Sequence, residues 1–253
     1  MKFKNKIAVV TGAASPMGIG FATASELGRQ GASVIVTDID RGRINARAAD
    51  LRNAGVAAIA MHHDVSSSES WAKVFELAVT EFGGVDILVN NAGVAILEPL
   101  DRLTIEDFER LCAINLKGTF LGCKLGVEAM GRRQSGGVII NVSSVAGIVG
   151  VAGTTGYGAT KGGIRLLTKS VALEAAKHGI RCNSVHPGAI LTEIQVEAQK
   201  ANPDLFAGIE AHIPLGRLAE PHEVASAISF FCSEDASYIT GTELIIDGGL
   251  TAQ

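Results

Sequence analysis

The feature that most constrains the fold is a strand, a glycine-rich loop and a helix that follow one another at the start of the chain. Residues 7–10 form an apolar run typical of a buried strand, residues 11–17 are mostly small, and residues 18–30 have apolar residues at helical spacing. In such a turn the backbone N–H groups and the helix N-terminus can approach a phosphate, because glycine has no Cβ in the way. The sequence therefore predicts a dinucleotide-binding unit, with a merely flexible loop as the alternative for a single match of this kind.

The alternation of strands and helices continues to the end of the chain. Further strands are expected at residues 33–37, 57–61, 85–89, 138–142, 180–185 and 243–247, and helices at 41–53, 66–82, 104–130, from about 157 onward, and 221–232. No internal repeat, low-complexity tract or linker interrupts the pattern. It predicts a single α/β domain over residues 1–253, doubly wound (Rossmann-type), with a seven-stranded parallel sheet flanked by helices.

Composition and charge exclude several classes of protein. Apolar residues make up 47% of the chain and the mean hydropathy is +0.29, which is typical of a globular protein rather than a disordered one. The formal net charge of −4 and the absence of a Lys/Arg cluster interleaved with aromatic residues argue against a nucleic-acid partner. Residues 1–6 lead into a strand too short for a signal sequence or a membrane span, so we expect a cytoplasmic protein without membrane contact.

No metal site is expected. The cysteines have no C-x-x-C spacing and lie in apolar segments, as reduced core thiols do; they are Cys112, Cys123, Cys182 and Cys232. His62, His63 and Asp64 are metal-ligating residue types, but neighbouring residues on a strand point to opposite faces and so cannot bind one ion together.

A second group of candidate functional residues follows the strand predicted at 138–142. Ser144 lies at the end of this strand, and Tyr157 and Lys161 lie four residues apart on the next helix, where they share a face. A neighbouring ammonium group favours the phenolate and would lower the pKa of the tyrosine. Such a phenol can exchange a proton with the oxygen of a substrate that undergoes hydride transfer. An ordinary pair on a helix face is the alternative.

Asp38 follows the second predicted strand, about twenty residues beyond the glycine loop. A carboxylate at this point accepts hydrogen bonds from an adenosine ribose and repels a 2′-phosphate, so NAD is predicted in preference to NADP. Arg41 and Arg43 argue the other way, because a guanidinium near the ribose could hold the extra phosphate.

The order of these motifs resembles that of the short-chain dehydrogenase/reductase family over essentially the whole chain. The resemblance is carried by Thr11-Gly12 with Gly18-Ile19-Gly20, by Asn90-Asn91-Ala92-Gly93, by Asn115, by Ser144 with Tyr157-x-x-x-Lys161, and by Pro187-Gly188 with Thr192. One departure is that five residues, rather than the usual three, separate Gly12 from Gly18. Which backbone amides of this lengthened loop contact the pyrophosphate is therefore left open.

The resemblance assigns roles to individual residues. It implies a catalytic group of Asn115, Ser144, Tyr157 and Lys161, in which Asn115 holds a water that links Lys161 to solvent. Motifs and resemblance together predict the following cofactor-binding residues: Gly12, Ser15, Met17, Gly18, Ile19, Asp38, Asp64, Val65, Asn91, Tyr157, Lys161, Pro187, Ile190 and Thr192. The segment at residues 191–217 is expected to form a lid over the substrate.

These features predict an NAD-dependent oxidoreductase that interconverts a secondary alcohol and a ketone. Residues 63–67, residues 120–124 and the chain end look most similar to bacterial hydroxysteroid and secondary-alcohol dehydrogenases, which favours a hydroxysteroid or another small hydrophobic substrate. The alternatives are a 3-oxoacyl-thioester reductase, a cis-dihydrodiol dehydrogenase, and, in a different class, a dinucleotide-sensing protein without catalysis. The first usually prefers NADP, and the last is expected to have lost one of the four catalytic residues.

Two helical segments are more apolar than contact with one face of a sheet requires. They lie around residues 112–127 and 164–175. Family relatives bury such helices between subunits, so we expect a homotetramer.

Overall fold

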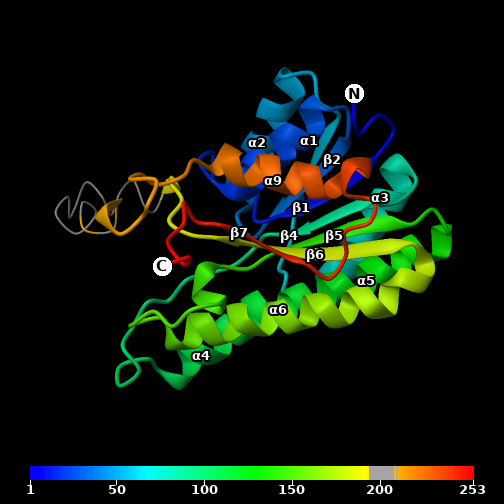
Figure 1. The fold of residues 1–253 in the computed structure, drawn as a ribbon. Helices are drawn as coiled ribbons and strands as arrows, with labels where there is room; N and C mark the ends of the chain where they lie inside the picture. Colours follow the sequence, from blue (N-terminus) through cyan, green and yellow to red (C-terminus); the bar gives the residue numbers. More distant parts are fainter. Residues whose placement is uncertain (194–207, 209) are drawn as a thin grey trace.

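Seven parallel strands form one sheet in the order β3-β2-β1-β4-β5-β6-β7 (Figure 1). The structure, a computed structural model, describes residues 1–193, 208 and 210–253. The strands are β1 (Ile7–Thr11), β2 (Ser33–Asp38), β3 (Ala58–His62), β4 (Ile87–Asn90), β5 (Gly137–Val142), β6 (Ile180–Pro187) and β7 (Glu243–Ile246). The predicted doubly wound α/β class is confirmed. Because the strand order reverses between β1 and β4, their carboxyl ends border the crevice in which open α/β sheets bind ligands.

Helices cover both faces of the sheet (Figure 1). On one face lie α1 (Ile19–Arg29), α2 (Arg41–Asn53) and α9 (Pro221–Cys232), and on the other α3 (Ser68–Phe82), α5 (Gly118–Arg133) and α6 (Thr155–Ala175). Successive residues of a strand point to opposite faces of the sheet. Val10 packs with residues of α1, α2 and α9, and Val9 packs with residues of α3, α5 and α6. Each fully buried apolar side chain contributes about 1.5–3 kcal/mol to the stability of this arrangement.

Local caps explain why several helices begin where they do. The Asp40 side chain accepts a hydrogen bond from the first turn of α2, and the Ser67 hydroxyl does the same for α3. Helix α9 starts with Pro221 and has a reciprocal capping box between Glu220 and Glu223. The capping residues lie next to the helices in the sequence. The observed bounds of α2 and α9 equal the predicted ones.

The helix predicted at 104–130 is present as an unbroken helical segment from Ile105 to Arg133, but it is not α-helical throughout. The structure has α4 (Ile105–Leu111), then a π-helical turn (Cys112–Lys117), then α5. Asn115 lies in this turn, where its Oδ1 accepts a hydrogen bond from the Val94 amide and its Nδ2 donates to the Val94 carbonyl, both at 2.9 Å. This side chain therefore bonds a backbone segment outside the helix, and single π turns inside α-helices are frequent at functional sites.

His62 and His63, which were considered for metal binding, lie in different environments. The His63 side chain is buried, with Nδ1 3.0 Å from the Thr37 hydroxyl, whereas His62 is exposed. All four cysteines are free thiols, of which Cys123, Cys182 and Cys232 are buried. Among the described residues, no helix combines the length and the apolar character needed to cross a membrane.

The contact between α5 and the sheet yields a stability prediction. A Cβ on Gly122 would collide with the Asn90 side chain and lie 2.8 Å from the Trp71 ring, whereas one on Gly131, in the same helix, meets nothing closer than 3.6 Å. Gly122→Ala should therefore lower the free energy of unfolding by about 1–3 kcal/mol through overpacking. Gly131→Ala, the matched control, should raise it by up to about 1 kcal/mol, because alanine is the better helix former. Urea unfolding measures both, and equal effects of the two changes would contradict this packing.

Candidate active site

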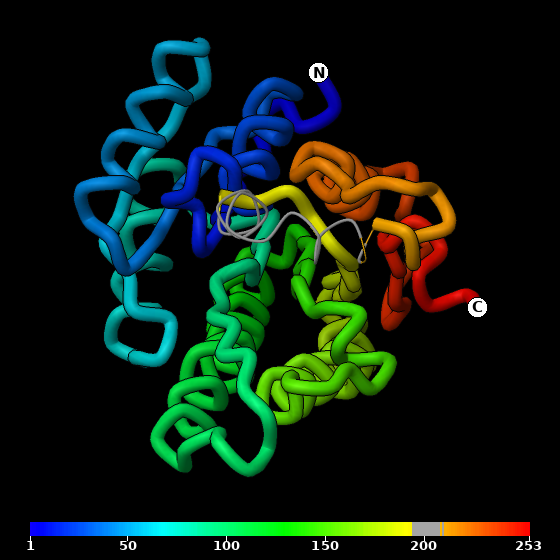
Figure 2. Tube along the Cα trace, turned by 90° about the vertical axis from the view of Figure 1, so that its left-hand side faces the viewer, coloured from blue at the N-terminus to red at the C-terminus, as the bar shows by residue number. Residues whose placement is uncertain are grey.

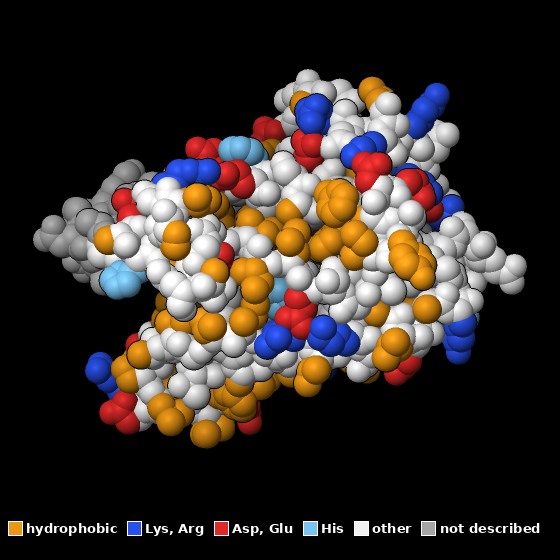
Figure 3. All heavy atoms as spheres, in the orientation of Figure 1, with side chains coloured by type: hydrophobic (Ala, Val, Ile, Leu, Met, Phe, Trp, Pro, Cys, Tyr) orange, Lys and Arg blue, Asp and Glu red, His pale blue; other side chains and the backbone are white. Residues whose placement is uncertain are grey.

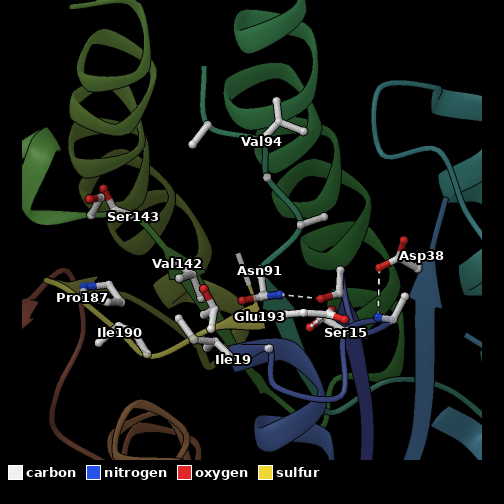
Figure 4. Close-up of a pocket in the computed structure, with 18 of the residues that line it drawn as sticks. Ser15, Ile19, Asp38, Asn91, Val94, Val142, Ser143, Pro187, Ile190 and Glu193 are labelled. Atoms are coloured by element: carbon white, nitrogen blue, oxygen red, sulfur yellow. Dashed lines mark hydrogen bonds between the residues drawn. The ribbon is translucent and has the colours of Figure 1, made fainter. Parts of the chain in front are cut away.

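A cavity of about 470 Å³ opens at the carboxyl ends of the central strands (Figure 4). Its walls come from the loop after β1, the end of β2, the loop after β4, the end of β5, the start of α6 and the loop after β6. Figure 2 shows that the segment after β6, in yellow, passes close to the first loops of the chain, in dark blue. The volume lies within the range of small-molecule sites.

The loops after β1 and β4 are bonded to each other. The Thr11 hydroxyl accepts hydrogen bonds from the amides of Asn91 and Ala92, each at 3.0 Å, and the Asn91 side chain donates to the carbonyls of Thr11 and Gly12, each at 2.9 Å. Gly12 has φ = +67°, and a Cβ there would lie 2.6 Å from the Ala92 Cα. Only glycine meets both requirements.

The lengthened glycine loop makes a tight turn before α1. The Gly18 amide donates to the Ser15 carbonyl at 3.1 Å, and Gly18 is the N-cap of α1. Because glycine has no side chain, it cannot bond the first-turn N–H groups itself, and these remain suited to a phosphate. Of the residues in this region that were predicted to bind the cofactor, Ser15, Gly18 and Ile19 line the cavity, but Met17 does not.

Asp38 projects into the cavity at the end of β2 (Figure 4). Its Oδ2 accepts a hydrogen bond from the Ala14 amide at 3.0 Å, and its Oδ1 accepts one from the Asp40 amide at 3.1 Å. Asp64 and Val65, which were predicted to bind the cofactor, are not among the residues that line the cavity. The Asp64 carboxylate instead accepts hydrogen bonds from the Ser66 amide and hydroxyl.

The structure brings Ser144, Tyr157 and Lys161 together on the opposite wall of the cavity. Lys161 is buried, its Nζ donates to the Val142 carbonyl at 2.9 Å, and burial lowers its pKa to about 8. Burial raises the pKa of Tyr157, and the interaction with the Ser144 side chain lowers it by less. The direction is opposite to the expected one, because Nζ lies 5.7 Å from the Tyr157 ring centre and is directed to a carbonyl.

Asn115 stands behind this group rather than in the cavity wall. A Cβ on Gly93 would lie 3.1 Å from the Asn115 Oδ1 and 3.4 Å from the Lys161 Nζ, so both side chains approach the same glycine. The Asn115 Nδ2 also lies 3.2 Å from the Thr160 hydroxyl, next to Lys161 in α6. Asn115 is thus close enough to serve the lysine through a bridging water, as the resemblance implies.

The wall contributed by the loop after β6 contains the remaining predicted residues. Pro187, Ile190 and Thr192 all line the cavity, as do Gly12 and Asn91 on the facing side. Figure 4 shows Pro187 and Ile190 on the side away from Asp38, which is the side of Val142 and Ser143.

His186 is a residue of this region that sequence reasoning missed. It is fully buried, its Nδ1 lies 3.2 Å from the Ser144 carbonyl, and its Nε2 lies 2.8 Å from the Ser184 hydroxyl. Burial lowers its pKa, so the ring is neutral near pH 7. A carbonyl only accepts hydrogen bonds, so we assign the ring proton to Nδ1. No sequence signal marks His186, because its contact with Ser144 depends on how β6 pairs with β5.

Comparison with known proteins yields full-length relatives. Residues 12–251 match a family model described as enoyl-(acyl carrier protein) reductase. The chain is 42% identical over 251 residues to 3beta-hydroxysteroid dehydrogenase 1 of Eggerthella lenta, an alignment that covers 98% of this chain and 94% of that protein. It is 38% identical over 251 residues to cyclopentanol dehydrogenase of Comamonas testosteroni, covering 99% of each.

A further relative and a solved structure agree with these. The NADP-dependent (R)-specific alcohol dehydrogenase of Lentilactobacillus kefiri is 34% identical over 261 residues, covering 100% of this chain and 99% of that protein. The solved structure of the protein gox2181 is similar with a TM-score of 0.95 at 32% identity, covering 100% of this chain and 98% of that one. The chain therefore belongs to the short-chain dehydrogenase/reductase family and is an oxidoreductase that acts on CH–OH groups.

Proposed function

We propose that this secondary-alcohol oxidoreductase uses NAD and acts on a hydroxysteroid or another hydrophobic secondary alcohol. The observation that carries the proposal is one cavity with the Asp38 carboxylate at one end and Tyr157 with Lys161 at the other. The first position suits an adenosine ribose, and the second suits the reacting carbons. The names of the relatives favour an alcohol over a 3-oxoacyl thioester, over a cis-dihydrodiol, and over a sensing function without catalysis.

The residues present fit a nicotinamide dinucleotide. The first-turn amides of α1 and the Ser15 hydroxyl are donors for its pyrophosphate, and Asp38 is an acceptor for its ribose. Thr192 and the backbone around Ile190 would hold the nicotinamide end. When bound, this cofactor accepts hydride from the alcohol carbon or returns it to the ketone.

In this proposal the side chains of the opposite wall move the proton. In alcohol oxidation the Tyr157 Oη takes the hydroxyl proton, and in ketone reduction it donates one to the same oxygen. Ser144 orients that oxygen by a hydrogen bond, and the neutral His186 holds the Ser144 carbonyl in place. Lys161 carries positive charge near the phenol, and Asn115 extends the path for protons toward solvent.

The preference for NAD is drawn from Asp38, since a 2′-phosphate would be repelled by its carboxylate. A relative named as NADP-dependent shows that the family uses both cofactors, so the choice depends on residues of this chain.

The apolar surroundings of the cavity support a hydrophobic substrate. The two loops that leave its walls, at residues 94–103 and 148–154, carry exposed apolar side chains: Leu97, Leu100, Val149 and Val151. Figure 3 shows the surface hollowed between the α4 end of the molecule and the C-terminal segment, with hydrophobic side chains on both sides. Most of the predicted lid at 191–217 lies outside the described residues, so its role stays a prediction.

The first test removes the proton-carrying oxygen. Tyr157→Phe should lower kcat for a 3β-hydroxysteroid or cyclopentanol with NAD⁺ by about a hundredfold to ten-thousandfold. The Kd for NADH should change by no more than about tenfold, since at most one neutral hydrogen bond is lost. Tyr238→Phe, which alters the other tyrosine of the chain at a fully exposed site, is the control and should keep kcat within about twofold. Equal kcat values for the two variants would contradict the role of Tyr157.

The second test uses pH. Oxidation requires the Tyr157 phenolate, so kcat/KM for the alcohol should rise with pH toward the raised pKa of this buried phenol. Ser144 lowers that pKa, and Ser144→Ala should therefore shift the rise to higher pH as well as reduce the rate. Ser143→Ala is the matched control, because the Ser143 hydroxyl donates to the Lys161 carbonyl, and it should not shift the profile. A shift to lower pH in Ser144→Ala would rule out this arrangement.

A homotetramer is part of the proposal. The outer surface of α5 and α6 carries exposed apolar residues, among them Leu166 and Leu173 of α6, which are 70% and 82% exposed. The wild type should sediment at four times the chain mass of 26.2 kDa, and Leu166→Glu with Leu173→Glu should give smaller species. Val79→Glu, an exposed site on α3, is the control. A monomeric wild type would refute the tetramer.

The cytoplasmic location stays a prediction.

A further inference from the structure

The structure bears on the conflict between Asp38 and the two nearby arginines. Arg43 lies in the first turn of α2 and lines the cavity beside Asp38 and Asp40, whereas Arg41 does not line it. A guanidinium at this place could bind the 2′-phosphate of NADP, which would weaken the preference that Asp38 sets.

Arg43 already has an ionic partner. Glu193, which follows Thr192 in the loop after β6, forms an ion pair with the Arg43 guanidinium. Its carboxylate also accepts a hydrogen bond at 3.0 Å from the hydroxyl of Ser15, and Figure 4 shows these two residues next to each other. The pair raises the pKa of Arg43 and lowers that of Glu193, so both groups are charged near pH 7. The side chains are 47% and 38% exposed, and such a pair adds little to folding stability.

We propose that Glu193 is a specificity-determining residue that excludes NADP. By pairing with Arg43 it keeps the guanidinium from a 2′-phosphate, and it adds a third carboxylate to Asp38 and Asp40 around the one arginine that lines the cavity. A phosphate that carries nearly two negative charges meets net repulsion there, whereas a ribose hydroxyl does not. This inference rests on the proposed use of NAD. Without Glu193, the preference for NAD over NADP would depend on Asp38 alone.

The test compares the affinities of two reduced cofactors for the full-length protein. Nicotinamide fluorescence gives the Kd values of NADH and NADPH for the wild type and for Glu193→Gln. The variant should bind NADPH about tenfold more tightly and NADH within about threefold of the wild type, because only NADPH has a group that the released guanidinium can bind. Adding Arg43→Gln to the variant should abolish the gain. Glu128→Gln, which breaks the exposed ion pair with Lys124 on α5, is the matched control and should leave the ratio of the two Kd values unchanged.

Several outcomes separate this inference from the proposed function. A wild type that binds NADPH as well as NADH would refute the proposed NAD preference, while a shift of the ratio in Glu193→Gln would still support the role of Glu193. An unchanged ratio in Glu193→Gln overturns the inference, as does equal tightening of both cofactors, which would mean that the carboxylate only competes with the pyrophosphate. The single variant Arg43→Gln, in which Glu193 is unchanged, tests whether Glu193 masks the guanidinium in the wild type. It should change the ratio by less than about twofold, and a large loss of NADPH affinity would show that Arg43 is not masked.

Discussion

The hydrogen bonds that join the loops after β1 and β4 are the constraint on which the rest of the site depends. Thr11 and Asn91 each contribute a side chain that bonds the backbone of the other loop, at the point where the strand order reverses. A parallel sheet leaves backbone groups unpaired at its carboxyl edge, and here they are satisfied by neighbouring loops. These hydrogen bonds fix the two loops as one surface of the cavity. Gly12, with its positive φ, lies within this surface, where the absence of a side chain lets a cofactor approach the backbone.

Buried polar groups hold the opposite wall in the same way. Lys161 bonds the carbonyl of Val142, His186 bonds the carbonyl of Ser144, and Asn115 bonds the backbone at Val94. Burying each of these polar side chains costs free energy because the side chain loses its contact with water. Each one forms a hydrogen bond with a backbone group that would otherwise be buried without a partner. These bonds join α6 to β5, the loop after β5 to β6, and the loop after β4 to the π-helical turn. The proton-carrying side chains are therefore held by neighbouring backbone groups rather than by the groups on which they act.

Local chemistry explains what the sequence predicted well and what it missed. The bounds of α2 and α9 follow from apolar spacing and caps within the segments themselves. The π turn at Asn115 depends on Val94, 21 residues away, and the pair of Arg43 with Glu193 spans 150 residues. The pKa direction of Tyr157 depends on burial, which no spacing encodes. Residue types and order thus indicated the site, while the contacts that tune it required the assembled sheet.

The contact between Ser15 and Glu193 joins residues 178 positions apart. Contacts of such long range form late in folding and make it slow, because a large loop must close before they are gained. During synthesis the glycine loop is made at the start of the chain. Glu193, which accepts the hydrogen bond from this loop, is made only after about three quarters of the chain. For most of its synthesis the growing chain carries a cofactor motif with an unfinished pocket around it.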